Sequence, residues 1–105
     1  DRTDVGAVEA IDGVSWTIDQ DLPPMACDDP EFADRVLDAA GAVQAGAGAH
    51  VAKPHATDAG WLADAGVTCV VCGPAEPGEA HTASESVSLD LLARCRSVYE
   101  RLTNS

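Results

Sequence analysis

The stretch Val67-Thr68-Cys69-Val70-Val71-Cys72 decides the expected fold, because it is a nearly continuous run of apolar and β-branched residues. A run of this length is typical of a strand that is buried on both faces of a parallel sheet. Two weaker strand signals precede it. Residues 14–19 alternate apolar and polar side chains, and residues 50–53 form a short segment before a proline. The sequence therefore predicts three strands.

Two helices are expected between these strands. Residues 28–31 (Asp-Asp-Pro-Glu) place acids and a proline where a helix begins, and Gly41 is a suitable end. Thr57 or Asp58 can cap a second, shorter helix that ends at Gly66. Both segments show apolar residues at helical spacing, which favours helices that are buried on one side.

A last helix is expected to open at residues 88–90. Its buried stripe repeats at helical spacing and comprises Leu91, Cys95, Val98 and Leu102. The alternation of strands and helices predicts the α/β class, as part of a parallel-rich layered sheet with helices on its faces. Ligands in such sheets gather beyond the carboxyl ends of the strands, which points to the loops at residues 55–60 and 73–85.

The charge balance excludes several classes of partner. Eighteen acidic residues against six basic ones give a net charge of −12. Such a surface repels phosphate backbones and anionic membranes, so neither nucleic acid nor membrane is an expected partner. No signal peptide and no membrane-spanning run is visible, which favours a cytoplasmic protein. Many Asp and one Lys resemble the composition of proteins from salt-loving organisms, with an ordinary acidic protein as the alternative.

Cys69 and Cys72 form a Cys-x-x-Cys motif, which elsewhere serves redox chemistry or zinc binding. On a strand, however, positions i and i+3 point to opposite faces. We therefore expect buried structural thiols, with a small thiol-redox protein as a minor alternative.

His81 is the best candidate for a metal ligand, because a neutral imidazole binds zinc well and the residue follows the strongest strand signal. Glu85, four residues later, could orient it from a second shell. A structural alternative exists, since Thr82-x-x-Glu85 also fits a capping box. His50 and His55 have less support, because neither has an acidic, Cys or His partner at a suitable spacing.

Three blocks occur in a fixed order before the last amphipathic helix: residues 56–60 (Ala-Thr-Asp-Ala-Gly), 70–74 (Val-Val-Cys-Gly-Pro) and 80–87 (Ala-His-Thr-Ala-Ser-Glu-Ser-Val). Together they resemble the C-terminal part of the zinc amidohydrolases. This family includes acetylornithine deacetylase, succinyl-diaminopimelate desuccinylase and glutamate carboxypeptidase. The resemblance covers roughly residues 54–103, and residues 16–25 resemble less closely the last strand of that family's lid domain.

The resemblance implies a parent protein with two domains. Residues 1–25 would be a remnant of the lid or dimerisation domain with its hinge, and residues 26–105 the C-terminal part of an α/β catalytic domain. The implied partners are a small N-acyl amino acid as substrate, and either the rest of the parent chain or a second copy. The implied reaction is hydrolysis of the substrate's amide bond, as in an acetylornithine deacetylase-like enzyme.

The resemblance also assigns site residues. It implies two zinc ions, with cobalt or manganese as alternatives, and His81 as the last metal ligand. Thr57, Asp58 and Gly73 fall on segments that line the substrate side. The family's other ligands have no counterpart in residues 1–53, and a catalytic zinc needs about three protein ligands. We therefore expect no catalytic residue in this chain and no activity from it alone. The alternative is a non-enzymatic acidic α/β module with a protein-binding or structural role.

Overall fold

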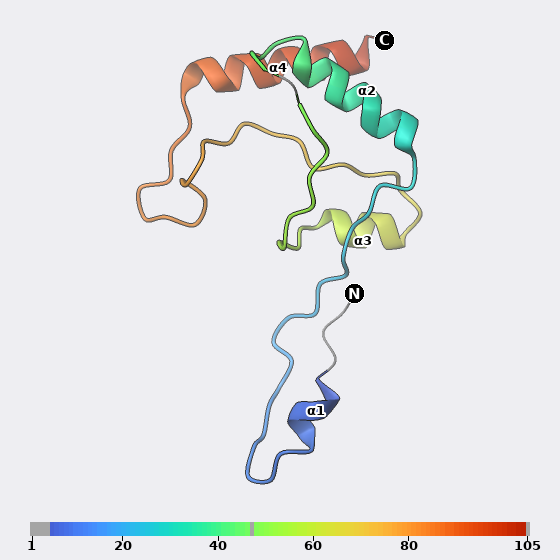
Figure 1. Cartoon of the computed structure of the whole chain (residues 1–105), viewed down its shortest axis with the longest axis vertical. Coiled ribbons are helices and arrows are strands. Elements are labelled where there is room, and N and C mark those ends of the chain that lie inside the picture. The colour runs from blue at the N-terminus through green and yellow to red at the C-terminus, as the bar shows by residue number, and fades with distance from the viewer. Residues whose placement is uncertain (1–4, 47, 105) are drawn as a thin grey trace.

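Four helices form the regular structure of the chain. The computed structural model describes residues 5–46 and 48–104. The helices are α1 (Gly6–Glu9), α2 (Pro30–Gly41), α3 (Ala59–Asp64) and α4 (Leu89–Thr103) (Figure 1). Within the described part of the chain, α2 and α4 are the only helices that pack against each other. Long irregular segments connect the helices and carry the candidate site.

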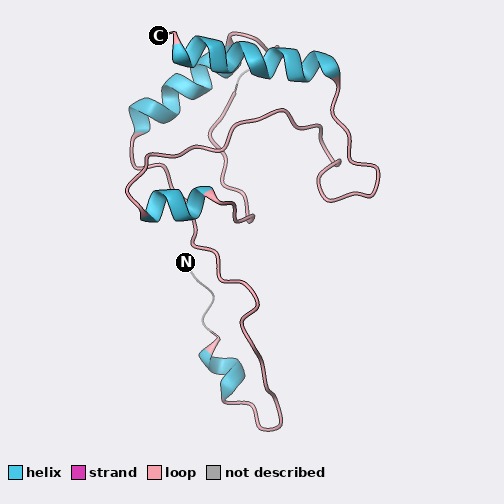
Figure 2. Cartoon of the chain, turned by 180° about the vertical axis from the view of Figure 1, so that it is seen from behind, coloured by secondary structure: helices cyan, strands magenta, loops and turns pink. Residues whose placement is uncertain are grey.

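The prediction of an α/β fold with a parallel sheet was wrong. No strand is present among residues 5–46 and 48–104 (Figure 2). Outside the helices, the described backbone–backbone hydrogen bonds join residues no more than five positions apart. The segments 14–19, 50–53 and 67–72 therefore do not pair with one another. A strand forms only when a neighbouring strand takes up its N–H and C=O groups, so an apolar pattern without such a neighbour leaves an irregular segment.

The three helices expected from their start signals are present. At α2, the Asp29 Oδ1 atom accepts a hydrogen bond from the backbone N–H of Phe32 at 2.9 Å. At α4, the Ser88 hydroxyl accepts one from the N–H of Leu91 at 3.1 Å. These caps satisfy N–H groups that have no partner inside a helix, which is why the helices begin there. The short helix α1 was not predicted.

The hydrophobic core is small and lies between α2 and α4. Its buried side chains are Val36, Ala39, Cys95 and Val98. The radius of gyration is 17.8 Å, against about 13 Å for a compact domain of this length. The accessible surface is 8286 Å², against about 5,500 Å² for a folded monomer of this mass. Much apolar surface is therefore exposed, including Trp61 and Val71, which are 52% and 67% exposed.

Residues 22–28 contact both α3 and the segment 67–72. The backbone carbonyl of Pro23 lies directly against Gly60 in α3, where any side chain would overlap it. The Thr68 hydroxyl donates a hydrogen bond to Asp28 Oδ1 at 3.1 Å. These contacts join α3 and the segment 67–72 to the chain that leads into α2.

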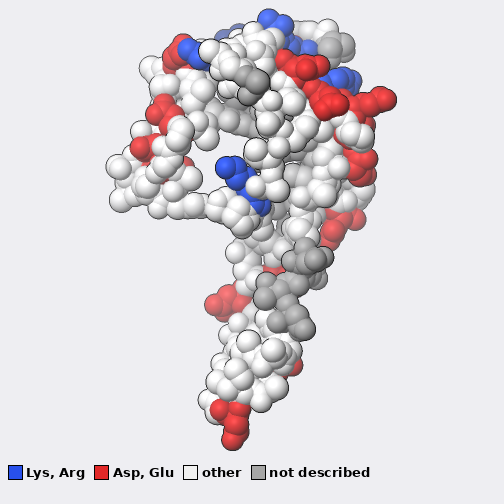
Figure 3. Space-filling view, in the orientation of Figure 1, with Lys and Arg blue, Asp and Glu red and all other residues white. Residues whose placement is uncertain are grey.

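The charged side chains are distributed unevenly. On the face shown in Figure 3, Asp and Glu extend from the region of α2 down to the lower end of the molecule near α1, and Lys and Arg are few. The cations of α4 are partly engaged with acids on the same helix, since Arg96 Nε lies 2.8 Å from Glu100 Oε1. No helix among the described residues has the length and apolarity needed to cross a bilayer.

Candidate functional site: the His55–His81 pair

His81 lies in the long loop that connects residue 73 to α4 (Figure 1). Two glutamates of this loop accept hydrogen bonds from its backbone. The Glu79 carboxylate accepts a hydrogen bond from the N–H of Ser86 at 3.1 Å. The Glu76 carboxylate accepts one from the N–H of Ser88 at 2.7 Å. Because Ser88 also caps α4, the loop is fixed to the start of that helix.

The His81 backbone is in the left-handed region, with φ at 62°, and it is the only non-glycine residue in the described chain with a positive φ. This conformation is uncommon for residues other than Gly, although His adopts it more often than most. Neighbouring turns support it: the Thr82 N–H donates to the Glu79 carbonyl at 3.2 Å, and the Thr82 hydroxyl donates to the same oxygen at 2.8 Å. The loop backbone therefore sets the direction of the His81 Cα–Cβ bond.

The structure places His55 next to His81. The two imidazole centroids are 6.0 Å apart, and the ring planes form an edge-to-face arrangement at 63°. Both side chains are exposed. No spacing along the chain indicated this contact, because it depends on how two distant loops meet.

His50 lies in a different environment. Its Nε2 atom is 2.8 Å from Asp34 Oδ1, so the third histidine is engaged with a carboxylate on α2. Spacing along the chain did not indicate this contact either, because Asp34 lies 16 positions before His50. This contact is exposed, with 54% and 70% of the two side chains accessible, and surface contacts of this kind contribute little to stability.

Two of the predicted substrate-binding residues follow His55 closely in the chain. The Thr57 hydroxyl accepts a hydrogen bond from the N–H of Ala59 at 3.2 Å, at the start of α3. Asp58 occupies the N-cap position but makes no capping hydrogen bond with its side chain. The Asp58 carboxylate is exposed next to the segment that carries His55.

Gly73 and Glu85 are placed differently. Gly73 lies against α4, where a methyl group in place of its hydrogen would meet the Tyr99 hydroxyl at 3.9 Å. Glu85 donates its backbone N–H to the Thr82 carbonyl at 3.3 Å, and the structure shows no hydrogen bond between its carboxylate and His81. Thr82-x-x-Glu85 forms a turn rather than the start of a helix. The assignment of Glu85 to a second shell remains a prediction.

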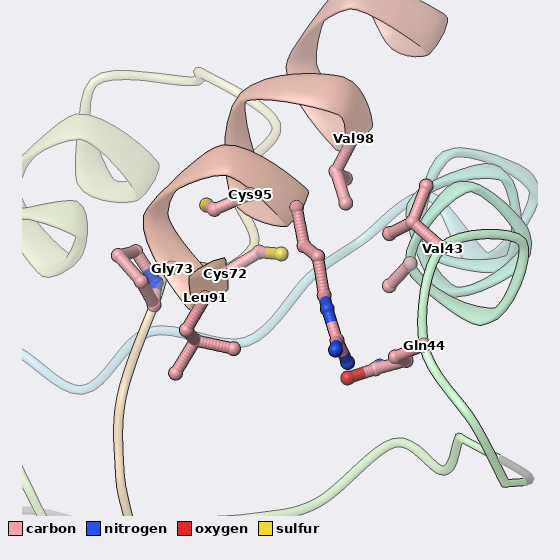
Figure 4. A pocket seen from close by; sticks show the side chains of 10 residues that line it. Val43, Gln44, Cys72, Gly73, Leu91, Cys95 and Val98 are labelled. Carbon is pink, nitrogen blue, oxygen red and sulfur yellow. The ribbon is translucent and has the colours of Figure 1, made fainter. Parts of the chain in front are cut away.

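The cysteines form no disulfide: all four are free thiols. Cys72 and Cys95 line one pocket between α2, α4 and residues 72–74 (Figure 4). Burial, and secondly the nearby Cys95 thiol, raise the pKa of Cys72 above its usual value. A raised pKa lowers the thiolate fraction and hence the reactivity, which fits a structural thiol rather than a redox centre.

Tyr99 completes this cluster. Its hydroxyl donates a hydrogen bond to the Cys72 carbonyl at 2.9 Å. A hydrogen bond with the Cys95 side chain, then burial, then the charges of Cys95 and Cys72 raise the pKa of Tyr99 to about 12. Tyr99 thus joins α4 to the segment from which the His81 loop departs.

The two imidazoles supply part of the donor set that a metal ion needs. Neutral imidazoles are good ligands for zinc and related ions, and His55 and His81 supply two of them. Among residues 5–46 and 48–104, however, no group of three His, Cys, Asp or Glu side chains could hold a metal ion. The described residues therefore fit part of a metal site and do not complete a catalytic one.

A model of the peptidase family M20/M25/M40 matches residues 4–105, and the chain belongs to this family. The family expected from the three sequence blocks is thereby confirmed. The chain is similar to the N-formyl-4-amino-5-aminomethyl-2-methylpyrimidine deformylase of Bacillus subtilis (strain 168), with 50% identity over 36 residues. That match covers 34% of this chain and 8% of the deformylase. No solved structure matches the chain.

Proposed function

We propose that the chain contributes to a metal-dependent hydrolase that cleaves the amide bond of an N-acyl substrate. The family match over residues 4–105 carries this proposal. The similarity to a deformylase supports it, because an N-formyl group is the smallest N-acyl group and its removal cleaves an amide. The finer assignment, an acetylornithine deacetylase-like enzyme acting on N-acyl amino acids, rests on the three sequence blocks and belongs to the same proposal.

In this proposal His81 holds a metal ion, with zinc as the first choice and cobalt or manganese as alternatives. When bound, the metal supplies Lewis-acid polarisation of the amide carbonyl. The turn around His81 fixes its backbone, and Thr57 and Asp58, on the segment that carries His55, would bind the substrate. Gly73 would line the substrate side from the segment next to α4.

The remaining groups of the site would come from another segment of polypeptide. A catalytic zinc needs about three protein ligands, and the described residues bring together only two imidazoles. The exposed apolar side chains give such a segment a surface to pack on, among them Trp61, Val71 and Leu89. We therefore propose that the rest of a larger protein, or a second copy, completes the site, and that the chain alone does not turn over substrate.

The test uses the larger protein that this proposal implies. Purified protein is assayed for acid released from a panel of N-formyl and N-acetyl amino acids, with the metal content measured in the same samples. We expect His81→Asn to abolish turnover, because asparagine tolerates the left-handed backbone but removes the imidazole. The matched control His50→Asn alters an exposed histidine on another contact and should leave turnover unchanged.

Full turnover and full metal content in His81→Asn would contradict the proposal. So would the absence of turnover on every amide of the panel by metal-loaded wild-type protein. The second result would favour a non-enzymatic module with a binding or structural role.

A further inference from the structure

Two carboxylates brace the loop that carries His81. Glu76 Oε1 accepts a hydrogen bond from the N–H of Ser88 at 2.7 Å. Glu79 Oε2 accepts one from the N–H of Ser86 at 3.1 Å, and the Ser86 hydroxyl donates to the same oxygen at 3.4 Å. Both glutamates precede His81 and both serines follow it, so these braces join the two limbs of the loop across the turn that contains the histidine.

Backbone pairing does not join the two limbs. The backbone–backbone hydrogen bonds described within the loop link Glu79 to Glu76, Thr82 to Glu79 and Glu85 to Thr82, so each spans three residues. Between the limbs lies an open cavity of about 200 Å³, which is lined by residues 74–76, 79–80 and 85–87. The shape of the loop therefore depends on the two carboxylates.

The charge of the loop makes these carboxylates more than ordinary surface acids. Residues 73–88 contain three glutamates and neither Lys nor Arg. Like charges repel one another, so the loop would open if its carboxylates had no donors. Hydrogen bonds from N–H groups to a carboxylate are stronger than those between neutral groups. Glu76 and Glu79 are both half-buried, which limits competition from water.

Glu76 is the better placed of the two. It makes the shorter hydrogen bond, and its donor Ser88 is the residue whose hydroxyl caps α4 through the N–H of Leu91. A negative charge at the start of a helix is favoured by the helix dipole. Glu76 thus ties the first limb of the loop to the most regular element of the chain.

We propose that Glu76 is a positioning residue for His81. Its carboxylate holds the first limb of the loop against the start of α4, and so fixes the backbone from which the His81 side chain departs. The inference rests on the proposed function, in which His81 holds a metal ion, and Glu76 itself does not touch that ion. Without Glu76 the loop has more conformations, and binding the ion has to order them.

The experiment measures Zn²⁺ affinity by equilibrium dialysis of the metal-free larger protein that the proposed function implies. Glu76→Ala removes the acceptor, whereas Glu76→Gln keeps an oxygen that can accept from Ser88. The control Glu100→Ala removes an exposed carboxylate near the other end of α4, where it pairs with Arg96. We expect Glu76→Ala to weaken Zn²⁺ binding about tenfold, the change that corresponds to one charge-assisted hydrogen bond, and Glu76→Gln to restore most of the affinity. Glu100→Ala should leave it unchanged.

A second measurement needs no metal. Proton NMR of the ¹⁵N-labelled 105-residue chain follows hydrogen exchange at the Ser88 amide. We expect this amide to be protected in the wild type and to exchange faster in Glu76→Ala. An unprotected Ser88 amide in the wild type would overturn the inference, whether or not the variants fold.

The outcomes separate the inference from the proposed function. If His81→Asn weakens Zn²⁺ binding and Glu76→Ala does not, Glu76 has no positioning role, while the role of His81 stands. If His81→Asn leaves Zn²⁺ binding unchanged, the metal-binding role of His81 fails and the inference fails with it. An equal loss of affinity in Glu76→Ala and Glu100→Ala would also overturn the inference, because it would show a general effect of removing charge.

Discussion

Tyr99 provides a direct test of how α4 holds the segment that leads into the His81 loop. Its hydroxyl donates to the Cys72 carbonyl at 2.9 Å, and the change Tyr99→Phe removes this hydrogen bond while keeping the ring. A hydrogen bond of this kind contributes about 0.5–1.5 kcal/mol to the free energy of unfolding. Because Tyr99 is 46% exposed, water replaces part of the lost bond, and we expect a loss of about 0.5–1 kcal/mol.

The pKa of Tyr99 provides a second and sharper test of the contacts around its hydroxyl. The hydrogen bond with Cys95, burial and the nearby thiols raise the pKa of Tyr99 from its usual value of 10.0 to about 12. The neutral phenol is thus favoured in the folded chain. The contribution of the neutral Tyr99 side chain to the free energy of unfolding is fully present below pH 10.0, where Tyr99 of the unfolded chain begins to ionise. This contribution is lost as the pH rises to about 12.

Tyrosinate absorbance near 295 nm measures this pKa without ambiguity, because Tyr99 is the only tyrosine of the chain. Circular dichroism at each pH establishes that the helices are intact. We expect the folded chain to titrate well above a urea-unfolded sample, and Cys95→Ala to lower the pKa of Tyr99 toward its usual value. Identical titrations of folded and unfolded chain, with helices intact, would refute the reasoning.

Three further predictions concern the packing and the charge. Val98→Ala removes two carbons from a side chain that is 4% exposed. It should lower the free energy of unfolding, measured with urea, by about 1.5–2.5 kcal/mol. An equal loss in the exposed control Leu92→Ala would contradict this. Gly60→Ala should lower the free energy of unfolding by about 1–3 kcal/mol, because the added methyl would overlap the Pro23 carbonyl. In the control Gly41→Ala the methyl meets no other atom, and this change should stabilise α2. The free energy of unfolding should rise with added KCl, because salt screens the net charge of −12; no change with KCl would show that this charge does not limit stability.

The helices could be predicted because their signals are local. Asp29 with Pro30 marks the start of α2, and Ser88 marks the start of α4, through hydrogen bonds that span three residues. Such caps depend only on the neighbouring sequence. The stripe of α4 was predicted for the same reason, and Cys95 and Val98 are indeed buried.

The sheet could not be predicted reliably because a strand depends on its neighbours. Residues 67–72 have the composition of a buried strand, yet no described segment pairs with them. Val71 is 67% exposed as a result. The apolar pattern identifies residues that favour burial, and whether a strand forms there depends on a partner that the pattern does not contain.

The contact between the two candidate loops could not be predicted. The sequence predicts that ligands gather at the loops 55–60 and 73–85, and each of these loops carries one histidine. That coincidence was the signal for the His55–His81 contact. It was missed because the two residues are far apart in the chain and no spacing rule connects them. The braces at Glu76 and Glu79 were also missed, since they depend on the path of the loop.

Zinc K-edge X-ray absorption of the zinc-loaded chain tests the central claim most directly, because multiple scattering from imidazole rings counts the histidines bound to the ion. The account predicts an imidazole ligand in the wild type that is lost after the change His81→Asn and kept after the control His50→Asn. A spectrum with oxygen ligands and no imidazole, or one that stays the same in His81→Asn, would contradict it.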